Sequence, residues 1–158
     1  MLANVPPPDL ADLCARLLFS KALADALLDT AHLVQNPLIE PDMPPSRVVA
    51  ALDGIGDLAL FAAWLIDDSN EAAENLSVRE RIRRYASEWR SVRPKTDGHA
   101  LRALGLEPGP CYARILARLR AARLDGEITT SAADGAEAAE SRLIARLLEE
   151  GICHDGAQ

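Results

Sequence analysis

The sequence predicts an all-α fold, and three observations support that prediction. Alanine and leucine dominate the apolar residues, whereas aromatic side chains make up only 4% of the chain, so residues that favour strands are scarce. Apolar residues recur at helical spacing, and proline clusters separate the segments in which they do so. A chain of 158 residues is long enough for one helical domain. We expect seven to eight helices, arranged as a body (residues 1–92) and a tail (residues 93–158).

The spacing of leucine and alanine predicts helical structure at the start of the chain, from Asp9 to about Val34. Asp9 is a candidate N-cap, because an aspartate side chain can accept a hydrogen bond from a first-turn amide. Phe19 or Ser20 is expected to break this segment into two helices. A short helix is then expected at about residues 45–52, before two glycines.

An unusually apolar helix is predicted from Leu58 to Ile66, directly after Asp57, which can cap it. Its apolar residues lie all around the helix instead of along one stripe. A helix of this kind is typical of a protein core, so we expect it to be buried.

The clearest periodicity belongs to a helix that begins at Asn70 or Ser77 and ends at Val92. Steps of four and three residues place five side chains on one apolar stripe, namely Val78, Ile82, Tyr85, Trp89 and Val92. On the opposite side, Arg79, Arg83 and Arg90 are predicted to form a ridge free of carboxylates. The ridge is interpreted either as a solvated face or as a surface for RNA. Arg84 is kept apart from it, because Glu80 and Glu88 each lie one turn away and predict a surface ion pair.

The second half of the chain predicts three helices separated by glycine and proline. Thr96 or Asp97 can cap a short helix that Gly105 ends. Gly109 and Pro110 suit the N-cap and the first position of a longer helix, which ends at about residues 125–126. The expected core residues of that helix are Tyr112, Ile115, Leu116, Leu119 and Ala122. A last helix, at about residues 134–150, is expected to pack through Leu143, Ile144, Leu147 and Leu148.

The turn between the first two of these helices carries the strongest sign of binding chemistry. Backbone N–H groups at the start of a helix attract anions, and Gly109 offers its own amide there. Arginines on both sides of the turn add positive charge, and these are Arg102, Arg114, Arg118, Arg120 and Arg123. Together these features indicate a track for phosphate groups. The alternative is an ordinary corner between two helices.

The net charge is −7, yet the charges are strongly segregated along the chain. Residues 1–78 carry −9 and residues 125–158 carry −6, whereas residues 79–124 hold 12 basic and 4 acidic side chains, for +8. Because a polyanion responds to local potential, the basic middle is compatible with RNA. Of the 17 basic residues only Lys21 and Lys95 are lysines, and the planar fork of arginine suits bidentate phosphate contacts.

The sequence contains no recognisable catalytic or metal-binding motif. The three cysteines and three histidines are scattered, which predicts reduced thiols and no metal site. No apolar run approaches the roughly 18 residues of a membrane span, and the N-terminal residues lack the features of a signal peptide. We therefore expect a cytoplasmic protein without a membrane partner.

A longer pattern runs through the basic middle. It comprises G-H-A-L at residues 98–101, L-G-L-E-P-G-P at residues 104–110 and L-D-G at the end of the following helix, after W-R-S-V-R-P at residues 89–94. Residues 77–128 thereby resemble the C-terminal region of bacterial class II tRNA nucleotidyltransferases, the CCA-adding and poly(A) polymerase-type enzymes. One position departs from the family pattern. Ala100 stands where the family has aspartate, so any contact made by that aspartate is absent.

The resemblance implies a helical body and tail that hold tRNA or another RNA while a head domain adds nucleotides to its 3′ end. In the family, magnesium and a nucleoside triphosphate bind the head, whose catalytic carboxylates have no counterpart in this sequence, so no cofactor is expected on this chain. The residues expected to contact RNA are Arg79, Arg83, Arg90, Arg93, Lys95, Arg102, Gly109, Arg114, Arg118, Arg120 and Arg123. The alternative is a protein-interaction module, such as a homodimer in which the acidic ends pair with the basic middle.

Overall fold

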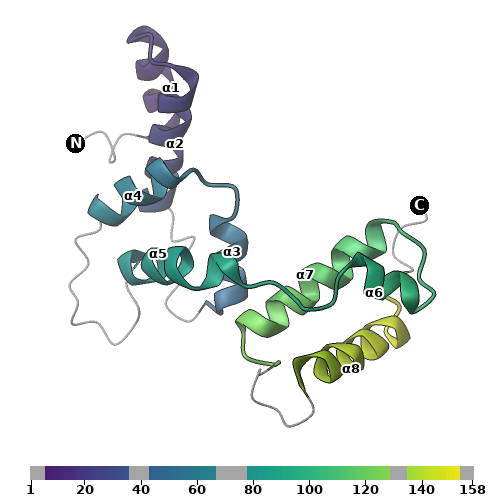
Figure 1. The fold of residues 1–158 in the computed structure, drawn as a ribbon. Coiled ribbons are helices and arrows are strands. Elements are labelled where there is room, and N and C mark those ends of the chain that lie inside the picture. Colours follow the sequence, from purple (N-terminus) through teal and green to yellow (C-terminus); the bar gives the residue numbers. More distant parts are fainter. Residues whose placement is uncertain (1–5, 36–42, 67–77, 129–134, 154–158) are drawn as a thin grey trace. The chain divides into compact units, whose positions relative to one another are not determined.

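The computed structural model describes residues 6–35, 43–66, 78–128 and 135–153, and every regular element within these residues is helical (Figure 1). They form eight α-helices and one short 3₁₀ helix. The predicted all-α fold with seven to eight helices is therefore confirmed. The chain divides into two compact units, Met1–Arg90 and Ser91–Gln158. The expected division into body and tail lies two residues further along the chain.

The described residues of the first unit form five α-helices. In chain order they are α1 (Pro7–Arg16), α2 (Lys21–Gln35), α3 (Pro45–Leu52), α4 (Asp57–Ile66) and α5 (Val78–Ser87). Helices α1 and α2 lie side by side and bury Leu10, Cys14 and Ala31 between them (Figure 1). The break expected at Phe19 or Ser20 falls in the turn that joins these two helices.

The start of α1 differs from the prediction. The N-cap is Pro6, which makes no side-chain hydrogen bond, and Asp9 lies inside the first turn. The next residue, Pro7, is the first residue of the helix. Proline suits that position because its φ angle is already helical and it has no N–H group to satisfy. Asp9 still contributes, since a negative charge in the first turn complements the helix dipole.

Helix α4 packs against α2 and α5 and buries Ala59, Leu60 and Ala63. In contrast, the side chains of Leu58, Phe61 and Leu65 are more than half exposed. The expectation that this helix is wholly buried is wrong. Its apolar residues lie on all sides, whereas the contacts with α2 and α5 bury only part of its circumference.

Helix α5 is shorter than expected, because it ends at Ser87 and the 3₁₀ helix η2 (Trp89–Ser91) follows it. Ile82 and Tyr85 of the expected apolar stripe are buried. The Tyr85 hydroxyl donates to the Asp53 carboxylate at 2.9 Å, and the buried Arg81 donates through Nη1 to the Met43 carbonyl at 3.0 Å. One of the two helix starts considered, Asn70, lies outside the described residues.

In the second unit, the described residues form three α-helices, namely α6 (Gly98–Ala103), α7 (Pro110–Leu124) and α8 (Gly135–Glu149). Helices α7 and α8 lie side by side (Figure 1). The buried core of the unit consists of Leu101, Ile115, Leu119, Ala122, Ile128, Leu143, Ile144 and Leu147. Most of the core positions expected for the second half of the chain are therefore confirmed.

Glycine, proline and aspartate delimit these helices as expected. The Asp97 carboxylate accepts a hydrogen bond from the Ala100 amide at 2.9 Å and caps α6. Gly105, with φ +82°, follows the end of α6 in the left-handed region that glycine adopts without strain. Gly109 is the N-cap of α7 and Pro110 its first residue.

A disulfide joins Cys111, in the first turn of α7, to Cys153, shortly after α8. The expectation of reduced thiols is therefore wrong for these two cysteines, whereas Cys14 is free and buried. The two α-carbons are 5.0 Å apart although 42 residues separate the cysteines in the sequence. Packing of α8 along α7 brings them together, and sequence spacing does not reveal such a pair.

Candidate nucleic-acid interface

Helix α7 contains four arginines and no acidic residue among its 15 residues. One side of the helix is buried in the core of the second unit. Helical spacing places Arg114 and Arg118 along one edge of that buried side, and Arg120 and Arg123 along the opposite edge. The arginines therefore form two rows.

Small residues occupy the solvent-facing side of α7 between the two rows. Ala113 and Ala117 are exposed there, and so is Gly109 at the start of the helix. No side chain caps this N-terminus, and the first turn contains no carboxylate. The positive end of the helix dipole is thus not offset by an acidic side chain of the helix, an arrangement that favours an anion.

Arg118, Arg120 and Arg123 of α7 make hydrogen bonds to residues outside the helix. Arg118 forms an exposed ion pair with Glu127 at 2.7 Å, and Arg120 donates through Nε to the Val92 carbonyl at 3.1 Å. Arg123 pairs with Glu140, and its side chain is only 12% exposed. We therefore assign Arg123 a structural role in the core, although it was among the residues expected to contact RNA.

Glu140 is the centre of this buried network. Its carboxylate is completely buried and accepts hydrogen bonds from the Lys95 amide, the Thr96 amide and the Thr96 hydroxyl, in addition to Arg123. Burial raises the pKa of Glu140, but the bonds from Thr96, Lys95 and Arg123 together hold that pKa below its usual value. The network fastens residues 95 and 96, which precede α6, to helix α8.

This fastened segment carries two of the expected RNA contacts, and α6 carries a third. Arg93, Lys95 and Arg102 are all exposed. The side chains of Lys95 and Arg102 make no ion pair with the residues that the structure describes. A notch of about 370 Å³ lies between this segment and α7, and both Arg93 and Arg120 line it. Cations from two segments are therefore close together in the second unit.

The arginines of the first unit differ from the expected ridge. Arg83 makes two hydrogen bonds of 2.7 Å to Glu80, and Arg90 pairs with Asp57 at 2.7 Å. The expectation of a ridge free of carboxylates is therefore wrong. Glu80 lies one turn before Arg83 on the same helix. Asp57 comes from the start of α4, and sequence spacing did not relate it to Arg90 in η2.

Glu80 also binds Arg84 at 2.9 Å, so the ion pair expected between these two residues is present. The hydrogen bonds from Arg83 and Arg84 lower the pKa of Glu80 to about 2. Arg79 is the remaining residue of the first unit that was expected to contact RNA. It donates through Nε to the Trp64 carbonyl at 3.0 Å. Its guanidinium carbon lies 5.2 Å from the centre of the Trp64 ring.

In the described part of the chain, no cluster of three or more His, Cys, Asp or Glu side chains is placed to hold a metal ion. The same residues contain no single helix long and apolar enough to span a membrane. Only α3 and α4 taken together, with a bend of 117° between them, meet that length and composition.

Sequence reasoning missed Glu140, although a signal for it was present. Leu143, Ile144 and Leu147 lie three, four and seven residues after Glu140. This helical spacing places Glu140 on the buried stripe of α8. A lone carboxylate on such a stripe requires a buried cation or several donors. Its actual partners, Arg123 and the 95–96 amides, come from distant segments.

Comparison with protein-family models, with curated proteins and with solved structures finds no match to this chain. The resemblance to nucleotidyltransferase tails therefore depends on the sequence pattern within residues 77–128.

Proposed function

We propose that this chain is a non-catalytic RNA-binding region of the tRNA nucleotidyltransferase or poly(A) polymerase type, which holds RNA while a separate head domain extends the 3′ end. The observation that carries the proposal is the solvent-facing side of α7. Alanines there separate two rows of arginines, and the helix begins without an acidic residue in its first turn.

Such a surface suits a phosphate backbone. Alanine and glycine let the backbone of a nucleic acid approach the helix closely, while Arg114, Arg118 and Arg120 reach phosphates on either side. The ion pair of Arg118 with Glu127 does not prevent this, because exposed pairs stabilise a protein by little and exchange readily. Arg93, Lys95 and Arg102 extend the positive charge beyond α7.

The proposed mechanism is electrostatic and involves no reading of bases. Double-stranded RNA is recognised mainly through its shape, its phosphates and its 2′-hydroxyl groups. A row of arginines suits this kind of recognition, since one guanidinium group can donate two parallel hydrogen bonds to the oxygens of a phosphate. The expected ligand is thus a structured RNA arm such as that of tRNA.

A salt titration of tRNA binding to the full chain tests the proposal. If six cations contact phosphates, the affinity should fall by about 10³-fold between roughly 50 and 200 mM salt. Arg118→Gln should weaken binding and reduce the slope of log K against log salt by about 0.9. The matched control is Arg146→Gln, which removes an exposed arginine from α8 and should leave the slope unchanged.

A nearly flat salt dependence of the unmodified chain would contradict the proposal. The alternative, a dimerisation module, makes the opposite prediction for the same variant. Arg118→Gln would then change the mass measured by light scattering and leave tRNA affinity as it was.

A further inference from the structure

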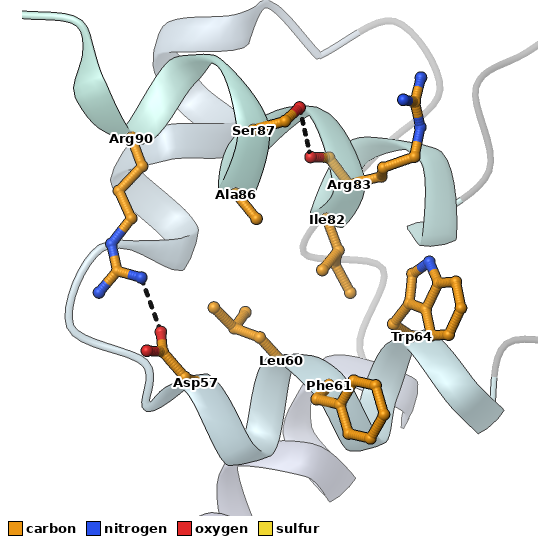
Figure 2. A pocket seen from close by; sticks show the side chains of 9 residues that line it. All are labelled: Asp57, Leu60, Phe61, Trp64, Ile82, Arg83, Ala86, Ser87 and Arg90. Atoms are coloured by element: carbon orange, nitrogen blue, oxygen red, sulfur yellow. Dashed lines mark hydrogen bonds and ion pairs between the residues drawn. The ribbon is translucent and has the colours of Figure 1, made fainter.

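A groove of about 560 Å³ lies between α4 and α5 in the first unit (Figure 2). Leu60, Ile82 and Ala86 contribute its apolar lining. The rings of Phe61 and Trp64 stand together on α4, and the ion pair of Arg90 with Asp57 lies at the first turn of that helix. The groove therefore combines apolar and aromatic surface with charged groups.

The aromatic pair is stacked and partly open to solvent. The ring centres of Phe61 and Trp64 are 6.0 Å apart and their planes differ by 16°. Arg79 lies over the Trp64 ring and helps to fix its orientation. Phe61 remains 57% exposed. The pair offers a flat apolar surface to another planar group.

Arginines and carboxylates both border the groove that holds the aromatic pair. Glu80 is shared by Arg83 and Arg84, so these three side chains together carry a net charge of +1. Arg83 uses Nε and Nη2 for Glu80, and Arg90 uses Nη1 for the largely exposed Asp57. Exposed ion pairs of this kind exchange readily, so an anion can compete for these guanidinium groups.

We propose that this groove binds one unpaired nucleotide of RNA, with the base against Phe61 and Trp64 and a phosphate at Arg83 or Arg90. The inference rests on the proposed RNA-binding function and adds a single-stranded subsite to it. A nucleotide matches both properties of the groove, because its base is planar with apolar faces and its phosphate is anionic. Every base has such a face, so binding here should depend little on sequence.

Trp64 provides a direct reporter, because the chain contains only two tryptophans. In a Trp89→Phe background, Trp64 is the sole indole, and titration with the single-stranded tetranucleotide r(A)4 should quench its fluorescence to saturation. Phe61→Leu keeps an apolar side chain but removes the ring, and should weaken binding roughly tenfold. Phe61→Tyr should restore it.

The arginines have a separate signature in the same titration. Either Arg83→Gln or Arg90→Gln should reduce the slope of log K against log salt by about 0.7, the value for one phosphate contact of a single strand. An unchanged slope in both variants would contradict the proposed phosphate contact. Phe61→Leu should leave that slope unchanged. Arg84→Gln is the matched control, because Arg84 binds the same Glu80 but does not line the groove.

Absence of quenching by r(A)4 would overturn the inference, as would equal affinities for the Phe61→Leu and Phe61→Tyr variants. Self-association of the chain that depends on Phe61 would also overturn it, because the groove would then hold a protein. Failure of the groove is distinguishable from failure of the proposed function. A blunt-ended RNA duplex should still bind in an Arg118-dependent manner if only the groove fails.

Discussion

The two arginine-rich helices, α5 and α7, differ in where their arginines find partners. Helix α5 contains its own carboxylate, Glu80, which binds Arg83 and Arg84 within one turn. Helix α7 has no carboxylate, and its arginines bind groups from other segments, among them Glu127 and Glu140. The charge of α5 is therefore partly neutralised by the helix itself, whereas the arrangement on α7 depends on the folding of the second unit.

The comparison also separates two roles of arginine. The pair of Arg83 with Glu80 is exposed, and the pair of Arg84 with Glu80 is part-buried. Pairs within one turn of a helix surface contribute little to stability, so α5 keeps exchangeable cations. The pair of Arg123 with Glu140 is buried and belongs to the structure of the second unit. Disruption of the buried pair should therefore change folding, and disruption of the Glu80 pairs should change binding.

The largest effect is expected for Glu140→Gln. The variant preserves the size of the side chain but leaves the buried guanidinium of Arg123 without its counter-charge. Breaking a buried pair in this way costs about 3–5 kcal/mol. Hydrogen exchange of the α8 amides should report the loss. The control Glu137→Gln, which removes an exposed carboxylate from the same helix, should change stability by less than about 0.5 kcal/mol.

The acid stability of the second unit offers an independent check on Glu140. Because the pKa of Glu140 is lowered in the folded protein, its carboxylate stabilises the fold above the unfolded pKa, and this contribution disappears as the pH falls through the folded value. Protection of α8 should thus decline below about pH 4.5 in the unmodified chain. A Glu140→Gln variant with the same acid profile would show that another carboxylate organises this unit.

A smaller effect is expected for Cys153→Ser. The disulfide to Cys111 closes a loop between positions 42 residues apart and restricts the unfolded chain. Its removal should lower the stability of the second unit by about 2–4 kcal/mol, measured by urea unfolding of the oxidised proteins. Addition of a reductant should destabilise the unmodified chain and leave the variant unaffected. An unmodified chain indifferent to the reductant would show that the bond does not form in solution.

The sequence predicts the features that depend on neighbouring residues. Asp97 caps α6, Gly105 ends it, and Gly109 with Pro110 begins α7, because each requirement is local to one turn of backbone. The boundaries of α2, α3 and α4 follow from the same kind of signal. These elements fix the all-α class and the position of the α7 N-terminus.

Features that depend on the packing of distant segments were not predictable from spacing. The ion pair of Arg90 with Asp57 joins residues 33 positions apart, and the Glu140 network joins α8 to residues 95, 96 and 123. The exposure of Phe61 likewise depends on which side of α4 its neighbours cover. Periodicity shows that a helix is apolar, but it does not show how many neighbours the helix has.

The smallest effect on stability, and the most direct test of the comparison, is expected for Glu80→Gln, which makes α5 resemble α7. The thermal midpoint should change little, because each lost ion pair lies within one turn of the helix surface and is at least partly exposed. In contrast, r(A)4 should bind more tightly at low salt as Arg83 and Arg84 lose their shared carboxylate. Since the pKa of Glu80 is about 2, mild acid does not reproduce the variant. Glu149→Gln on α8 alters the net charge equally. If it raises the affinity as much, total charge governs binding, and the partners of individual arginines do not.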